Sequence, residues 1–173
     1  MPAPARQGPV PPLVLTPALD DSPEIVQALG DRARALSRFP REEAVLLIAH
    51  GPNDSRDNAR WRARLRRIAR DLKKKNGFFS VEGLTLQEDA PPHVREAATQ
   101  ALRNRAHHWA QKGKRVLAVP VLISEGGIER GVAKRLEGLP VSLGRPLLDH
   151  GALSQWLARQ VRDAAKAFPK DTP

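Results

Sequence analysis

The chain of 173 residues contains no cysteine and no tyrosine, and aromatic residues make up only 4% of it. Without cysteine, the sequence excludes disulfide scaffolds, thiolate zinc sites, iron–sulfur clusters and cysteine nucleophiles. Because aromatic side chains are scarce, the hydrophobic core must be mainly aliphatic. Any chemistry that the protein performs must therefore use histidine, carboxylates, hydroxyls or the backbone.

Long hydrophobic runs and nucleotide-binding motifs are also missing. No apolar stretch reaches the roughly 18–20 residues that span a bilayer, and the N-terminal residues do not have the pattern of a signal peptide. We therefore expect a cytoplasmic protein that does not enter a membrane. The sequence has no GxxxxGK[ST] motif and no dinucleotide fingerprint, which disfavours a P-loop hydrolase and a dinucleotide-binding domain.

Positive charge is in large excess, with 29 Lys and Arg against 19 Asp and Glu and a net charge of +10. The segment 56–75 holds ten basic and two acidic residues, so it carries +8 of that total. Within it, Trp61, Leu65, Ile68 and Leu72 have helical spacing, which predicts an amphipathic helix whose arginines face water. Such a balance favours a polyanionic partner, such as nucleic acid, anionic lipid or a polycarboxylated small molecule.

The N-terminal part of the chain differs in composition from the rest. Seven of the 16 prolines lie within the first 23 residues, which predicts a tail or linker over residues 1–21. A leading helix is expected within 22–39, and a single α/β domain over 40–168. Residues 16–36 resemble residues 145–165 when one gap is allowed, so the leading helix is either the remnant of a preceding repeat or an ordinary amphipathic helix.

From residue 44 onwards, apolar runs alternate with amphipathic segments. This pattern predicts four strands, over 44–49, 78–86, 115–124 and 141–148, and four helices, over 56–75, 94–109, 128–136 and 152–167. Such alternation is typical of a parallel sheet with helices on both faces and right-handed crossovers. Pro120 removes one ladder donor from the third strand, so we expect an irregularity or bulge there.

Candidate functional residues follow the predicted strands, where ligands bind in open parallel sheets. His50 follows the first strand and can hold a metal ion or accept a proton, although a histidine here can instead cap a helix or bond a loop carbonyl. Glu88 and Asp89 follow the second strand, and Glu88 is either an oxygen ligand, a proton acceptor or a solvated loop residue. His150 follows the fourth strand. The turn 124–127 precedes a helix, so its backbone N–H groups can face a carboxylate or phosphate.

Four motifs in this order resemble a known family. They are VLLIAHG (45–51), LTLQEDAPP (84–92), VLAVPVLISEGG (116–127) and PLLDH (146–150). Together they resemble the small class II tetrapyrrole chelatases of the CbiX type, which insert cobalt into sirohydrochlorin, with related members handling nickel or iron. The resemblance covers residues 44–165. It implies a flavodoxin-like, three-layer chelatase fold, a divalent metal ion as substrate and no permanently bound cofactor.

The resemblance also assigns roles to individual residues. It implies that His50 binds the metal and accepts a proton, with Glu88 as second ligand or proton relay. The position of the family's second histidine is occupied by Ile128, which cannot bind a metal, so His150 or Glu125 would have to assist. The remaining candidates are substrate-binding residues: Asn53, Ser124, Glu125, Gly126 and Gly127. The expected partners are a tetrapyrrole and a second copy or a second chelatase-like half.

Two alternatives to metal insertion remain open at the level of sequence. Because Ile128 replaces a histidine, the chain can be a non-catalytic relative that binds a metal or a tetrapyrrole without joining them. It can also be a nucleic-acid-binding protein that uses segment 56–75. The absence of tyrosine, the few aromatic residues for base stacking and the lack of a known motif disfavour this last interpretation.

Overall fold

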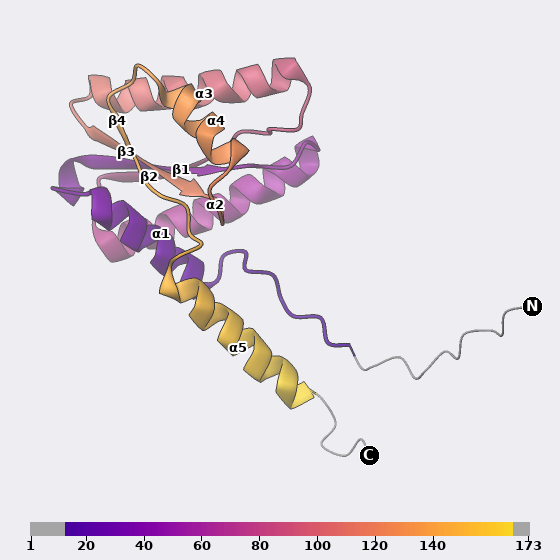
Figure 1. The fold of residues 1–173 in the computed structure, drawn as a ribbon. Coiled ribbons are helices and arrows are strands. Elements are labelled where there is room, and N and C mark those ends of the chain that lie inside the picture. The colour runs from indigo at the N-terminus through magenta and orange to yellow at the C-terminus, as the bar shows by residue number, and fades with distance from the viewer. Residues whose placement is uncertain (1–12, 168–173) are drawn as a thin grey trace, which may run out of the picture.

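The computed structural model describes residues 13–167 and confirms the predicted fold class. Four parallel strands form one sheet in the order β2-β1-β3-β4, and helices cover both of its faces (Figure 1). The strands are β1 (Glu43–Ala49), β2 (Ser80–Thr85), β3 (Arg115–Val121) and β4 (Val141–Leu143). The helices are α1 (Pro23–Leu36), the 3-10 turn η1 (Pro40–Glu42), α2 (Ser55–Asn76), α3 (Pro92–Gln111), α4 (Gly127–Leu136) and α5 (Gly151–Ala167).

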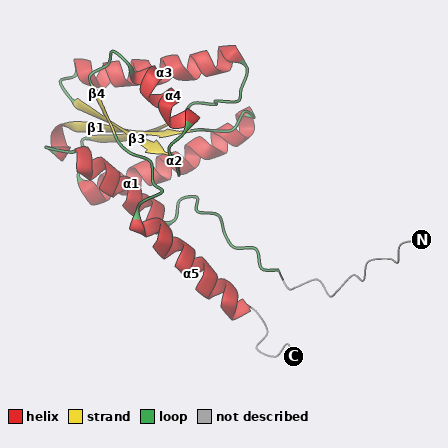
Figure 2. Ribbon diagram, in the orientation of Figure 1, coloured by secondary structure: helices red, strands yellow, loops and turns green. Residues whose placement is uncertain are grey.

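The molecule has three layers, with the sheet between two sets of helices (Figure 2). Strand β1 lies inside the sheet, between β2 and β3. All seven of its residues are buried, because its side chains alternate between two separate cores. Val45 and Leu47 pack with α1 and α2, whereas Leu46 and Ile48 pack with α3 and α4. An uninterrupted apolar run is what a strand covered on both faces requires, so this part of the prediction is confirmed.

Strands β2, β3 and β4 are shorter than predicted, whereas β1 begins one residue earlier, and Pro120 causes no bulge. Pro120 stays in regular register opposite Ile48 of β1, so the expected irregularity was wrong. The short edge strand β4 pairs with β3 only as far as Ala118. The backbone N–H that Pro120 lacks would point beyond the end of β4, where β3 has no partner strand. A proline is therefore compatible with a regular strand at this position.

The leading helix α1 belongs to the core of the domain. Ser22 caps it by accepting a hydrogen bond from the backbone N–H of Ile25, and Leu29 and Ala33 are fully buried in the same cluster as β1. Residues 1–12 of the predicted tail lie outside the described residues, and residues 13–22 form no helix or strand. The origin of α1 from an earlier repeat remains a prediction. Within residues 13–167, no helix is both long and apolar enough to cross a membrane.

A buried carboxylate joins the core at the amino edge of the sheet. Glu43 is 1% exposed and accepts hydrogen bonds from the backbone N–H groups of Arg38 and Phe39 at 2.8 and 3.2 Å. It also accepts from the Ser37 hydroxyl and from Arg115 on β3 at 3.1 Å. This network ties the connection from α1 to the first residue of the central strand.

Candidate functional site

The first two strands of the sheet end in turns that are bonded to each other. The backbone N–H groups of Leu86 and Gln87 donate to the carbonyl oxygen of His50 at 3.1 and 2.7 Å. Since β1 and β2 are parallel and adjacent, both turns leave the same carboxyl edge. His50 and the acidic pair that follows Gln87 are thereby held at one rim, as the sequence predicts.

The ring of His50 is partly exposed, and a polar group of the protein lies close to each of its nitrogens. Its Nδ1 lies 2.9 Å from the carbonyl oxygen of Gly51, and its Nε2 lies 3.3 Å from a carboxylate oxygen of Asp89. Because a carbonyl only accepts hydrogen bonds, we assign the proton of the neutral ring to Nδ1. The lone pair of Nε2 then faces the rim, where it can bind a cation or accept a proton.

The pair formed by His50 and Asp89 has the geometry of two ligands to one ion. Metal bonds of about 2.0–2.2 Å from nitrogen and oxygen place neighbouring ligands about 3.0–3.5 Å apart, and the observed separation is 3.3 Å. Within residues 13–167, no group of three or more histidine and acidic side chains could hold an ion.

Glu88 lies on the same turn but faces α4 and α3. Its carboxylate accepts a hydrogen bond of 2.7 Å from Arg135, and Arg135 also donates to the hydroxyl of Thr99 at 3.0 Å. Glu88 could bind a metal only after its ion pair with Arg135 is broken. Asp89, rather than Glu88, contacts His50. The sequence placed Asp89 at this edge without assigning it a role, since two adjacent side chains on a turn have directions that spacing does not predict.

His150 is held by other parts of the molecule. Its Nδ1 accepts a hydrogen bond of 3.1 Å from the backbone N–H of Ala152, at the start of α5. Its Nε2 lies 3.2 Å from Asp31 on α1. In the described part of the chain, no hydrogen bond or ion pair joins His150 to His50 or Glu88. Its contacts are those of a helix-capping residue.

The turn from Ser124 to Gly127 lines two shallow hollows beyond the end of β3. One, of about 320 Å³, extends to Ile128 and Glu129 at the start of α4. The other, of about 260 Å³, is bounded by Arg145 and Asp149. A hydrogen bond from Arg32, together with the positive charge of Arg145, holds the pKa of Asp149 below its usual value. Asn53 is exposed in the turn between β1 and α2.

Gly51 allows the tight approach of the first turn to β2, and an alanine there is expected to destabilise the fold. Its φ is +74°, and an added Cβ would lie 2.6 Å from the Cβ of Thr85. Gly77 has a similar φ of +72° but open space around it. An alanine would strain the left-handed backbone at both sites, but its Cβ would crowd a neighbouring side chain only at position 51.

We therefore expect Gly51→Ala to lower the free energy of unfolding by at least about 1 kcal/mol more than Gly77→Ala. Urea denaturation of both variants measures the difference. Equal losses at the two sites would contradict the close packing of Gly51 on Thr85.

Comparisons with known proteins agree with this geometry. The CbiX family model matches residues 44–164, whereas no curated protein matches the sequence. Among solved structures, SirB from Bacillus subtilis with Fe3+ has a TM-score of 0.63 at 22% identity, covering 90% of this chain and 61% of that one.

Two further structures have the same fold. The sirohydrochlorin chelatase SirB from Bacillus subtilis subspecies spizizenii in complex with cobalt has a TM-score of 0.59 at 16% identity, covering 87% of this chain and 54% of that one. DR2241 from Deinococcus radiodurans, a multi-domain protein with structural similarity to chelatases, has a TM-score of 0.53 at 20% identity, covering 80% and 29%. The present chain thus spans less than two thirds of the length of each of these neighbours.

Proposed function

Because the chain belongs to the CbiX family, we propose that it inserts a divalent metal ion into sirohydrochlorin or a related tetrapyrrole without ATP. Cobalt is the proposed ion, with nickel or iron as the other candidates, and cobalamin or tetrapyrrole biosynthesis in the cytoplasm is the proposed setting. The observation that supports this function is the pair of His50 Nε2 and Asp89 Oδ2, 3.3 Å apart at the open carboxyl edge of the sheet. The ion is a substrate, and no permanently bound cofactor is required.

The proposed reaction needs a loosely held ion and an acceptor for two protons. A divalent ion sheds water as Nε2 of His50 and the carboxylate of Asp89 bind it, and the macrocycle then approaches from the open side. Each of two pyrrole nitrogens loses one proton as it bonds to the metal, so the metallated ring carries the same net charge as the metal-free ring and two protons are released. His50, once it releases the ion, and Glu88, once it leaves Arg135, are the proposed proton acceptors.

Binding of the tetrapyrrole is assigned to the neighbouring hollows. The macrocycle carries several carboxylates, and the net charge of +10 favours its approach. Arg145 borders one hollow, and the first backbone N–H groups of α4 have no side-chain cap. The turn 124–127 is therefore the proposed seat for carboxylate arms, and Asn53, exposed three residues after His50, is proposed as a further polar contact.

A second copy of the chain, or a second chelatase-like half, is proposed to cover this open site. Helix α5 starts against α1 and extends away from the body of the domain (Figure 1). Leu157 and Val161 on α5 are 57% and 61% exposed. Apolar side chains exposed in this way on a projecting helix are typical of an interaction surface.

The direct test mixes the protein with sirohydrochlorin and Co2+, Ni2+ or Fe2+ in the absence of oxygen. We expect the absorption spectrum of the metallated ring to develop faster than in the protein-free reaction, with one metal preferred. A rate equal to the spontaneous one with all three ions would contradict metal insertion as the function.

A non-catalytic role remains the second candidate, because Ile128 lies at the start of α4, on the hollow formed by the turn 124–127. Equilibrium binding of sirohydrochlorin or metal without a metallated product would favour this role. Nucleic-acid binding through α2 is less favoured, since four of its arginines are paired with carboxylates. These pairs are Arg60–Asp57, Arg64–Asp20, Arg67–Asp21 and Arg70–Asp71.

A further inference from the structure

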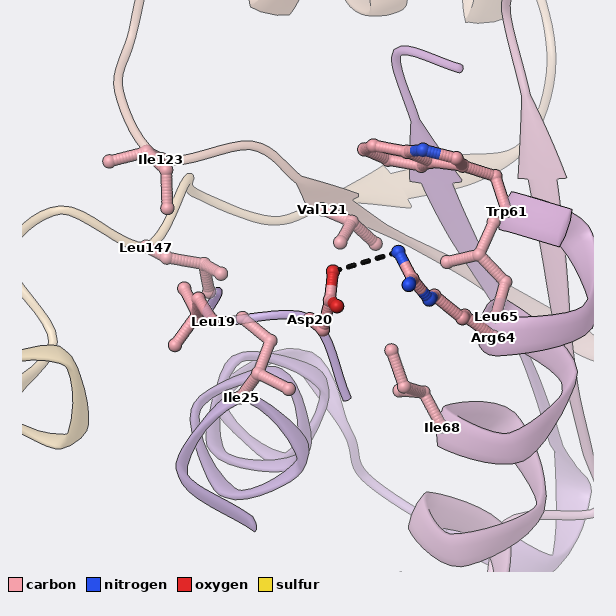
Figure 3. A pocket seen from close by; sticks show the side chains of 10 residues that line it. All are labelled: Leu19, Asp20, Ile25, Trp61, Arg64, Leu65, Ile68, Val121, Ile123 and Leu147. Carbon is pink, nitrogen blue, oxygen red and sulfur yellow. Dashed lines mark hydrogen bonds and ion pairs between the residues drawn. The ribbon is translucent and has the colours of Figure 1, made fainter. Parts of the chain in front are cut away.

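An apolar cavity of about 190 Å³ opens between α1, α2 and the end of β3 (Figure 3). Its walls are aliphatic and include Ile25, Leu65, Ile68, Val121, Ile123 and Leu147. Trp61, which shares a helical stripe with Leu65 and Ile68, lies at its rim and is 39% exposed.

One ion pair lies across the cavity. A guanidinium nitrogen of Arg64 is 2.9 Å from a carboxylate oxygen of Asp20, and both side chains are partly exposed. Asp20 has a φ of +33°, a conformation that residues other than glycine rarely adopt. Because an exposed ion pair contributes only about 0–1 kcal/mol, Arg64 can exchange Asp20 for another carboxylate at little cost.

The cavity borders the proposed substrate-binding surface. Ile123 lines both the cavity and the hollow formed by the turn 124–127. The two hollows are therefore neighbours, just beyond the end of β3.

Size and chemistry limit what the cavity can take. A cavity of about 150 Å³ lined by aliphatic and aromatic side chains holds a benzene molecule. The observed volume of about 190 Å³ thus accommodates one five-membered ring with its substituents, but not a whole macrocycle. Apolar walls and a guanidinium at the rim fit a ring edge that carries a carboxylate arm.

We propose that this cavity receives one ring of the tetrapyrrole. A carboxylate arm of that ring forms an ion pair with Arg64 in place of Asp20, and the edge of the ring contacts Trp61. This inference rests on the proposed function and assigns Arg64 a role in substrate specificity. Arg64 acts in binding and not in metal insertion, since it is no part of the pair formed by His50 and Asp89.

The test is a titration of metal-free sirohydrochlorin into the protein, followed by the absorption of the macrocycle and the quenching of tryptophan fluorescence. Arg64→Gln is expected to weaken binding about ten-fold, which is the usual effect of losing one charge-assisted hydrogen bond. Asp20→Asn is expected to tighten binding several-fold, because it removes the competing carboxylate. A merely structural ion pair would move both variants in the same direction.

Arg67→Gln serves as the matched control, because Arg67 forms a similar pair with Asp21 at 2.7 Å but does not line the cavity. Its affinity should equal that of the wild type. In the insertion assay, Arg64→Gln should raise KM and leave kcat unchanged, as expected when an interaction is equal in the ground and transition states.

The outcomes separate this inference from the function on which it rests. Unchanged affinity in both Arg64→Gln and Asp20→Asn, or equal weakening in both, would overturn the role of the cavity while leaving metal insertion intact. If the wild type itself binds no sirohydrochlorin, the proposed function is overturned and the inference with it.

Discussion

Replacement of His50 by alanine is expected to lower the initial rate of metal insertion at least about 100-fold, the usual effect of losing a group that transfers a proton. The variant loses the nitrogen that faces the rim and leaves Asp89 as a single ligand. A saturating metal concentration should restore little of the rate, because the variant lacks His50 both as a metal ligand and as a proposed proton acceptor. Absorption spectra of sirohydrochlorin with Co2+ measure this directly.

Two further variants show whether the effect is specific. His107→Ala removes an exposed imidazole on α3 and should leave the rate unchanged. Asp89→Asn keeps the size of the side chain beside His50 but removes the charge, so it should raise the metal concentration needed for half-maximal rate. If His50→Ala were as fast as the wild type, neither metal binding nor proton transfer could be assigned to this residue.

The second large effect concerns stability and lies at the opposite edge of the sheet. Glu43→Ala is expected to lower the free energy of unfolding by about 3 kcal/mol, because each buried donor left without its acceptor costs about 1–3 kcal/mol. The change leaves the backbone N–H groups of Arg38 and Phe39 without their acceptor, and Arg115 loses its carboxylate partner while keeping its hydrogen bonds to Leu36 and Ser142. Urea denaturation near neutral pH measures the loss.

The same carboxylate makes stability depend on pH. Burial by itself would raise the pKa of Glu43, but hydrogen bonds from Arg38, Ser37, Phe39 and Arg115 outweigh it and hold the pKa below the usual 4.5. A group with a lowered pKa stabilises the folded state fully above its unfolded pKa, and this contribution is lost as pH falls through the folded pKa. The wild type should therefore lose stability as the pH falls below about 4.5.

Glu43→Gln separates this effect from acid denaturation in general. The amide keeps the size of the side chain but does not titrate, so the stability difference from the wild type should shrink as the pH falls below 4.5. Glu42→Gln is the control, because Glu42 is the exposed neighbour, and its pH profile should follow that of the wild type. A Glu43→Gln profile parallel to the wild type would show that Glu43 does not contribute to the pH dependence.

Much of the fold was predictable because it depends on local patterns. The apolar run 44–49 indicated a strand buried on both faces, and alternation with amphipathic helices indicated a parallel sheet. Pro120 was predicted wrongly, because its setting depends on where a neighbouring element ends: β4 stops before reaching Pro120. Spacing along one segment does not contain that information.

By itself, the amino-acid sequence determined the fold class, the edge of the sheet that carries His50, Glu88 and the turn 124–127, and the resemblance that led to the family. These follow from hydrophobic periodicity and from the common direction of parallel strands. Only the tertiary structure decided which side chains meet: Asp89 with His50, Arg135 with Glu88, Asp31 with His150 and Asp20 with Arg64. Each of these contacts joins residues of two separate elements. Which residues meet depends on the direction that each turn gives to its side chains in the packed molecule.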